Sequence, residues 1–203
     1  TRQLKDKYGK IIRLHSNIKK DEGDYIYNTV RQNKCKVCVE VGMAYGMSAF
    51  FICRALRYNE QESMNNDKHI LYSIDPNQST QWQGLGVENL KRDKLSSYHK
   101  LLETTSYHAL PSLLKDNEDN VDFIFIDGWH TFDYTLVDFF YSDLLLKVGG
   151  YIVLDDALHA GPAQVIRYLV ENYTHYKKLD VNVRTIAVFK KMKKDDREWS
   201  FHK

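Results

Sequence analysis

The strongest constraint on the fold is an alternation of short apolar runs with segments of helical periodicity. Each run has the length and continuity of a buried strand and is followed by apolar residues spaced three or four apart. Strands and helices that alternate in this way build a parallel sheet, because each helix carries the chain back across one face. We therefore expect an α/β protein with a doubly wound, mostly parallel sheet and helices on both faces. Its strands are expected at 36–42, 69–76, 98–105, 121–128 and 150–157.

The segments around these strands complete the expected organisation. Residues 179–192 alternate in places and predict one or two antiparallel strands at a C-terminal edge. The basic stretch KKMKKDD (190–196) is expected to be a solvated end and not a phosphate-binding patch. We expect one domain over 1–203, with an N-terminal helical extension (1–33), a core (34–190) and a polar tail (191–203). Helices are expected at 21–32, where Asp21 could be the cap, and at 46–58, 86–95, 106–116, 131–146 and 161–173.

Composition excludes several classes of protein. The formal net charge of +2 gives no reason to expect nucleic acid or an acidic membrane as a partner. No stretch approaches the roughly 18 consecutive apolar residues of a membrane helix, and TRQLKDKYGK does not resemble a signal peptide, so we expect a cytoplasmic protein. Three cysteines indicate a reducing compartment. Cys35 and Cys38 lack a second pair to complete a zinc site and are expected to pack in the core, on opposite faces if one strand carries both.

The first strand runs into a glycine-spaced turn, VEVGMAYGMS, and carries a carboxylate at Glu40. In a doubly wound sheet, ligands bind at the carboxyl ends of the strands. Gly42 allows a tight turn, and Gly46 lets the next helix begin close to a ligand. Two glycines are also compatible with a turn that serves packing alone. A carboxylate inside a strand is costly, so Glu40 suggests a nearby partner.

The second strand ends at Asp75, whose two oxygens suit two ribose hydroxyls. The spacing from Gly42 to Asp75 exceeds the roughly 20 residues of a dinucleotide fingerprint. Ala44 also stands where that fingerprint has its second glycine. A nicotinamide cofactor is therefore less well supported than another nucleoside-containing ligand.

Three aspartates follow the fourth and fifth strands, which should be neighbours. Asp127, Asp155 and Asp156 would repel one another in a shared cleft unless a hard cation neutralised them, and oxygen ligands suit magnesium, manganese or calcium. The alternative is that one aspartate caps a helix and another faces water. His130, three residues past Asp127, is a candidate general base because histidine exchanges protons near neutral pH.

These strand ends together resemble the class I S-adenosylmethionine-dependent O-methyltransferases, from about residue 36 to 157. The run IDGWHTFDYTLVDFFYSDLLLKVGGYIVLDDA is similar to the metal-dependent branch, which includes the catechol-type, macrocin-type and family 24 enzymes. The resemblance implies a Rossmann-like sheet, S-adenosylmethionine and a divalent cation, with Mg²⁺ expected. The catechol branch has asparagine at the position of Asp156 and lysine at that of His130, which favours a sugar-type acceptor.

Roles for individual residues follow from the resemblance. It places Glu40, Gly42, Gly46 and Ser48 around the methionine part of the cofactor, where Glu40 would bind the cationic group directly or through water. Asp75 would hold the ribose. The adenine would be bordered by Ser106, Tyr107 and Trp129, and the cation would be bound by Asp127, Asp155 and Asp156, of which Asp127 also borders the cofactor.

We therefore expect a methyltransferase that acts on a hydroxyl of a small acceptor, with a sugar or sugar-containing metabolite favoured. Trp82 and His159 could contact this acceptor, although loop packing explains each equally well. Neither nucleic acid nor a membrane is expected as a partner, and a homodimer is possible. The alternatives are a metal-independent methyltransferase, a nicotinamide-binding oxidoreductase and a non-catalytic scaffold.

Overall fold

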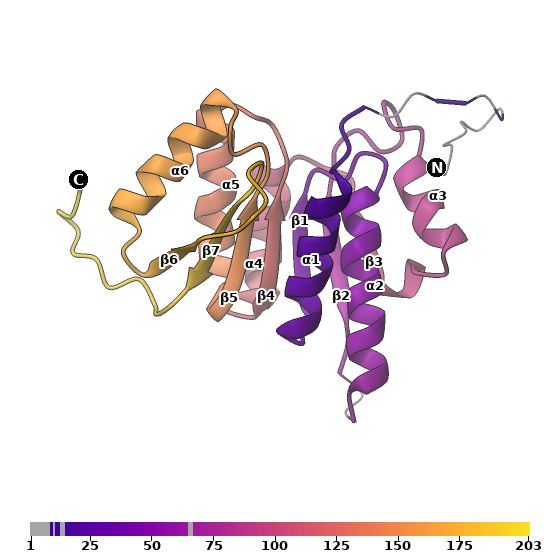
Figure 1. Cartoon of the computed structure of the whole chain (residues 1–203), viewed down its shortest axis with the longest axis horizontal. Coiled ribbons are helices and arrows are strands. Elements are labelled where there is room, and N and C mark those ends of the chain that lie inside the picture. The colour runs from indigo at the N-terminus through magenta and orange to yellow at the C-terminus, as the bar shows by residue number, and fades with distance from the viewer. Residues whose placement is uncertain (1–8, 10, 13–14, 65–66) are drawn as a thin grey trace.

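The computed structural model of the chain describes residues 9, 11–12, 15–64 and 67–203, and a seven-stranded sheet forms the centre of this part (Figure 1). The strand order is β3-β2-β1-β4-β5-β7-β6. Strands β1 to β5 pair in parallel, whereas β7 runs antiparallel to both β5 and β6. The expected doubly wound sheet with an antiparallel edge is confirmed. The strands are β1 (Val37–Val41), β2 (Ile70–Ile74), β3 (His99–Leu102), β4 (Val121–Ile126), β5 (Leu146–Leu154), β6 (Tyr176–Leu179) and β7 (Ala187–Lys191).

Helices cover both faces of the sheet, and the strands are buried between them. Successive side chains of a strand point to opposite faces. On β1, Val39 therefore packs with one set of helices and Cys38 with the other. The set on the Cys38 face is α1 (Lys20–Gln32), α2 (Met47–Glu62) and α3 (Leu85–Arg92), and the set on the Val39 face is α4 (Ser106–Asn117), α5 (Phe132–Leu145) and α6 (Ala160–Asn172).

The expected elements are present, with shifts at their ends. β5 begins four residues before the expected position 150, because Leu146 already pairs with Val121 and a register shift lies between Val121 and Phe123. The preceding helix accordingly ends at Leu145. Of the strands expected within 179–192, β7 lies inside that range, whereas β6 begins earlier, at Tyr176.

The start of α1 differs from the prediction, which placed the cap at Asp21. Lys19 is the N-cap, and its backbone N–H donates to the carboxylate of Glu22. Glu22 is thus the acidic residue of a capping box. Asp21 lies within the first turn, where a negative charge interacts favourably with the helix dipole. Of the expected N-terminal extension, residues 1–8, 10, 13 and 14 lie outside the described residues.

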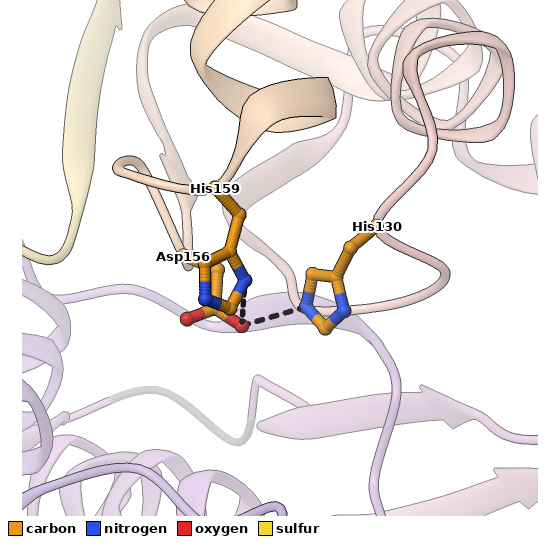
Figure 2. A group of neighbouring side chains, drawn as sticks. All are labelled: His130, Asp156 and His159. Atoms are coloured by element: carbon orange, nitrogen blue, oxygen red, sulfur yellow. Dashed lines mark ion pairs between the residues drawn. The ribbon is translucent and has the colours of Figure 1, made fainter.

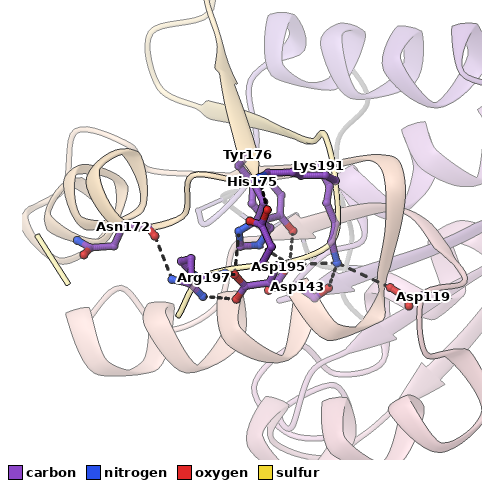
Figure 3. A network of polar contacts seen from close by, with 10 residues as sticks. Asp119, Asp143, Asn172, His175, Tyr176, Lys191, Asp195 and Arg197 are labelled. Carbon is purple, nitrogen blue, oxygen red and sulfur yellow. Dashed lines mark hydrogen bonds and ion pairs between the residues drawn. The ribbon is translucent and has the colours of Figure 1, made fainter. Parts of the chain in front are cut away.

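The C-terminal segment is held against the fold, so the prediction of a solvated end is wrong for part of it. Lys191 is buried at the end of β7, and its Nζ donates to the carbonyl oxygens of Asp143 (2.7 Å) and Leu146 (2.9 Å). Further along, the Arg197 guanidinium donates to the carbonyl oxygen of Asn172 (3.0 Å), at the end of α6 (Figure 3). These bonds use cationic side chains to satisfy carbonyl oxygens that helix ends leave without partners.

The three cysteines are free and buried, which confirms the expected core packing. Cys35 precedes β1, and it therefore shares one hydrophobic cluster with Cys38 and does not lie on the opposite face. Within the described residues, every helix is too short or too polar to span a membrane.

Candidate active site

The carboxyl ends of β1, β2, β4 and β5 open into a cavity of about 920 Å³. This is the edge at which doubly wound sheets bind ligands, and the volume is typical of a small-molecule site. Acidic side chains outnumber basic ones in its lining, and large aromatic side chains form much of its wall. The carboxylates are Glu22, Asp75, Asp127, Asp155 and Asp156, the lysine is Lys19, and the large aromatic residues are Trp82, Tyr107, Trp129 and Tyr134.

The glycine turn after β1 brings two strand ends into close contact. Gly42 has φ +86°, and a Cβ at this position would lie 1.9 Å from the carbonyl oxygen of Asp127. The Asp127 N–H in turn donates to the carbonyl oxygen of Val41 (2.8 Å). Gly46 also has a positive φ and packs against the backbone of Gly86 on α3. Gly42 is thus required by the approach of the backbones, and it lines the cavity, whereas Gly46 does not.

Asp75, at the end of β2, is hydrogen-bonded to the glycine turn that follows β1. Its Oδ2 accepts hydrogen bonds from the backbone N–H groups of Met43 (3.1 Å) and Ala44 (2.8 Å) and from the Gln78 amide (3.2 Å). Its Oδ1 accepts one, from the N–H of Asn77 (2.8 Å). Because a carboxylate oxygen accepts about two hydrogen bonds, only Oδ1 can take a further donor. The expected role toward a ribose stays a prediction and is reduced to one hydroxyl.

Glu40 lies behind the cavity wall and is not among its lining residues. It is fully buried, and its two oxygens accept hydrogen bonds from the hydroxyls of Ser48 on α2 (2.8 Å) and Ser73 on β2 (2.5 Å). Burial raises the pKa of Glu40 to about 8, although both serines oppose the shift. Glu40 and Ser48 contact each other, and their expected place around the methionine part of a cofactor stays a prediction.

The residues expected around an adenine lie at the cavity. Ser106 begins α4, Tyr107 follows it, and Trp129 comes from the turn after β4. The Trp129 side chain is 69% exposed, and the rings of Tyr107 and Tyr134 lie 6.1 Å apart. These aromatic faces are available for stacking on a planar ligand.

Asp127 and Asp155 follow the paired strands β4 and β5 and lie close to each other. Burial raises the pKa of Asp127 to about 6, in spite of a hydrogen bond with His130. Burial, followed by the charge of Asp127, raises the pKa of Asp155 to about 8. The two groups therefore titrate as a pair that favours a bound proton or cation.

His130 contacts two of the aspartates, and its contact with Asp156 is drawn in Figure 2. Its Nε2 is 2.8 Å from Oδ2 of Asp156 and 3.4 Å from Oδ1 of Asp127. The hydrogen bond with Asp127 raises the pKa of the imidazole. Nε2 of His130 is thus close to both Asp127 and Asp156, two of the three aspartates that the sequence suggested as ligands of a cation.

The oxygens of Asp127, Asp155 and Asp156 do not all lie within 4.8 Å of one another, so their role as a joint ligand set stays a prediction. Among the described residues, the ligand atoms at this cavity that all lie within 4.8 Å of one another belong to His130, Asp156 and His159. Asp156 has a left-handed backbone (φ +49°) and lies beyond the end of β5. Its Oδ2 is 2.8 Å from Nε2 of His130, whereas Oδ1 of Asp155 accepts the Asp156 N–H (2.8 Å).

The sequence suggested that the N-terminal region helps to form the acceptor pocket, but it did not single out Glu22 or Thr185. Glu22 is buried at the start of α1 and accepts a hydrogen bond from the Thr185 hydroxyl. The Thr185 carbonyl oxygen accepts the N–H of Ala157 (2.8 Å), just after the aspartate pair. Both Glu22 and Thr185 line the cavity. The helix was predicted, but no local signal indicates which strand end its first turn will approach.

These features define a Rossmann-like α/β protein with a ligand-sized cavity at the carboxyl edge of its sheet. A family model described as a methyltransferase domain matches residues 39–157, more than half of the chain. The chain belongs to this family, and the expectation of a methyltransferase is confirmed. No curated protein matches the sequence.

Solved structures of methyltransferases have the same fold. An O-methyltransferase from Bacillus cereus in complex with SAH has a TM-score of 0.70 and 16% identity, over 88% of this chain and 84% of that one. The O-methyltransferase TomG from Streptomyces achromogenes, involved in tomaymycin synthesis and in complex with SAM, has a TM-score of 0.71 and 16% identity. The match covers 87% of this chain and 82% of that one. The SAH-bound methyltransferase PaMTH1 from Podospora anserina has a TM-score of 0.70 and 17% identity. The match covers 88% of this chain and 81% of that one.

Proposed function

We propose that this methyltransferase transfers a methyl group from S-adenosylmethionine (SAM) to a hydroxyl of a small acceptor. The acid-lined cavity is the observation that carries the proposal. SAM bears a sulfonium and an ammonium group, and acidic side chains outnumber the one lysine among the described lining residues. A bound cation would favour the ionised forms of Asp127 and Asp155, whose pKa values burial raises. Complexes of similar structures with SAM or with its product S-adenosylhomocysteine (SAH) support this donor.

The cavity wall offers a partner for each part of the donor. Oδ1 of Asp75 has capacity for one ribose hydroxyl. Ser106, Tyr107 and Trp129 supply a hydroxyl and two aromatic faces for the adenine. The Gly42 turn borders the methionine part, and Glu40 lies behind this wall.

The same lining favours a neutral, hydroxylated acceptor. Carboxylates at the rim disfavour a phosphorylated or otherwise anionic substrate. Aromatic side chains such as Trp82 and Tyr134 suit the face of a sugar or another ring. Together with the histidine at position 130, where the catechol branch has lysine, this supports the sugar-type acceptor.

His130 is placed to accept the proton of the attacking hydroxyl. SAM supplies an electrophilic methyl group, and the oxygen that attacks it must lose its proton. Because Nε2 of His130 faces Asp156 and Asp127, the neutral ring holds its proton on Nε2 and presents Nδ1 as the acceptor. The two carboxylates then stabilise the imidazolium that forms, as a carboxylate does in a catalytic triad.

The mechanism has a metal-dependent and a metal-independent form, which differ in whether a divalent cation takes part. A bound cation would lower the pKa of a coordinated hydroxyl. The expected Mg²⁺ site of three aspartates does not fit the positions of their oxygens, so no step is derived through it. The contact of His130 with both carboxylates is compatible with either form, because the imidazole can hold a proton or a cation beside them.

Binding of SAH to the purified chain tests the choice of donor. We expect saturable 1:1 binding in calorimetry, weakened about tenfold or more in Trp129→Ala, because stacking of a base on an aromatic ring contributes about 1–3 kcal/mol. Trp199→Ala is the matched control, since Trp199 is 99% exposed and lies outside the cavity lining. Absence of SAH binding would refute the proposed function.

Methyl transfer to a panel of hydroxylated compounds then tests the chemistry. If His130 is the base, His130→Ala lowers kcat by about 10²–10⁴-fold and leaves SAH affinity unchanged. Full activity in a chelator would establish the metal-independent mechanism. Activity that is lost in the chelator and restored by an added divalent ion would establish the metal-dependent one.

A further inference from the structure

Two histidines and an aspartate converge at the rim of the cavity (Figure 2). Oδ2 of Asp156 lies 2.8 Å from Nε2 of His130 and 3.4 Å from Nδ1 of His159. Bonds of about 2.0–2.2 Å to a tetrahedral ion place its ligand atoms roughly 3.3 Å apart. The three atoms are thus close to the spacing of a ligand set without rearrangement of the backbone.

The backbone holds the two histidines at a fixed separation. His159 is the N-cap of α6, and its N–H donates to the carbonyl oxygen of Asp156 (2.8 Å). The first turn of α6 presses on the loop that carries His130, because a Cβ on Gly161 would lie 2.3 Å from the His130 carbonyl oxygen. Contact between α6 and this loop therefore holds the backbones of His130 and His159 in place relative to Asp156. Ligands that are positioned in advance bind an ion at a lower entropic cost.

The donor atoms select the class of ion. Magnesium, calcium and manganese prefer oxygen ligands, whereas imidazole suits iron, nickel, copper and zinc. A set of two imidazoles and one carboxylate therefore differs from the oxygen-only site that the sequence suggested.

We propose that the cation site of this protein consists of His130, Asp156 and His159 and binds a divalent ion of the iron-to-zinc series in preference to magnesium. A catalytic use for this ion rests on the proposed function, whereas the choice of the three ligands rests only on their positions. In the metal-loaded protein, His130 is a ligand through Nε2. Its role as proton acceptor then belongs only to the metal-free form.

Metal titration of chelator-treated protein tests the site directly. Wild type is titrated with Co²⁺, Zn²⁺, Mn²⁺ and Mg²⁺ by calorimetry, and the Co²⁺ form is examined by its visible absorption, which reports nitrogen ligands. We expect one equivalent of Co²⁺ or Zn²⁺ to bind, with Mg²⁺ at least about tenfold weaker. His159→Asn should weaken Co²⁺ binding about tenfold or more and change the absorption band.

Asparagine is a good helix N-cap, so His159→Asn should retain α6. Asp156→Asn provides a second variant, because asparagine tolerates a positive φ. His202→Asn is the matched control, since His202 is exposed and does not line the cavity. Its titration should equal that of wild type.

The inference is overturned if the His159 and Asp156 variants bind Co²⁺ as wild type does, if Mg²⁺ binds as tightly as Co²⁺, or if no ion binds. SAH binding in chelator, measured on the same samples, separates this result from the proposed function. Intact SAH binding with no metal binding refutes the inference alone. Metal binding that depends on His159 without SAH binding supports the ligand set and refutes the donor.

Discussion

At the scale of single residues, Glu40 shows how a carboxylate can be retained inside a sheet without an ion pair. Glu40 and Ser73 are direct neighbours in the parallel register of β1 and β2, and both point toward α2. The Ser73 hydroxyl is also 2.8 Å from Nε2 of His99, and burial lowers the pKa of that histidine to about 4. Glu40 therefore has neutral partners only, which is why burial controls its ionisation.

This environment predicts a dependence of stability on pH. The pKa of Glu40 is about 8 in the folded protein and 4.5 in the unfolded chain, so the folded state binds more protons between these values. The contribution of Glu40 to the free energy of unfolding is greatest below pH 4.5 and falls as the pH rises through about 8. We expect Glu40→Gln to be more stable than wild type at pH 8, by a few kcal/mol, and the difference to shrink toward pH 5.

Urea unfolding at pH 5, 6, 7 and 8, without cofactor, measures this effect. Gln can satisfy Ser48 and Ser73, because their hydroxyls rotate to donate or accept. Glu88→Gln is the control, since Glu88 lies exposed on α3 beside Lys91. Parallel curves of stability against pH for wild type and Glu40→Gln would contradict the assignment.

At the scale of secondary-structure elements, the contact between the ends of β1 and β4 positions the site. A side chain at position 42 would meet the Asp127 carbonyl oxygen at 1.9 Å and would also force a residue other than glycine into φ +86°. We expect Gly42→Ala to lower the free energy of unfolding by more than about 3 kcal/mol and to abolish SAH binding, because the two strand ends must separate.

Gly149→Ala separates the clash with the Asp127 carbonyl oxygen from the strain of a positive φ. Gly149 has a similar φ of +88°, but a Cβ there would meet no atom within 4 Å. This control should lose only about 1–2 kcal/mol, the cost of a left-handed alanine, and should bind SAH normally. Equal losses in the two variants, measured by urea unfolding and calorimetry, would show that the contact with Asp127 is unimportant.

The elements themselves were largely predictable, because apolar periodicity and continuity are local properties of the chain. The boundaries were less so. The start of β5 depends on pairing between Leu146 and Val121, and the start of α1 on the capping box of Lys19 and Glu22, which replaces Asp21. Each depends on a contact that periodicity does not encode.

At the scale of the whole molecule, the C-terminal segment contributes to stability. The Arg197 guanidinium lies 4.0 Å from the centre of the Tyr173 ring and donates to the Asp195 carboxylate and to the Asn172 carbonyl oxygen (Figure 3). We expect Arg197→Ala to lose roughly 1–2 kcal/mol, which corresponds to a decrease in Tm of about 2–8 °C.

Thermal unfolding followed by circular dichroism checks this expectation. Lys193→Ala is the control, because Lys193 forms an exposed ion pair with Asp196. It should leave the Tm unchanged, and both variants should bind SAH as wild type does. An unchanged Tm in Arg197→Ala would show that the segment is not docked through this residue.

The sequence by itself determined the order of strands and helices, the family, and the placement of Asp75, Asp127, Asp155 and Asp156 at strand ends, because these depend on local periodicity and on the geometry of a parallel sheet. Only the tertiary structure decided which side chains meet. It turned Glu40 toward two serines, directed Asp156 to His130 and His159, and brought Glu22 and Thr185 to the cavity. The physical reason is that side-chain direction depends on backbone torsion and on packing between segments distant in the chain.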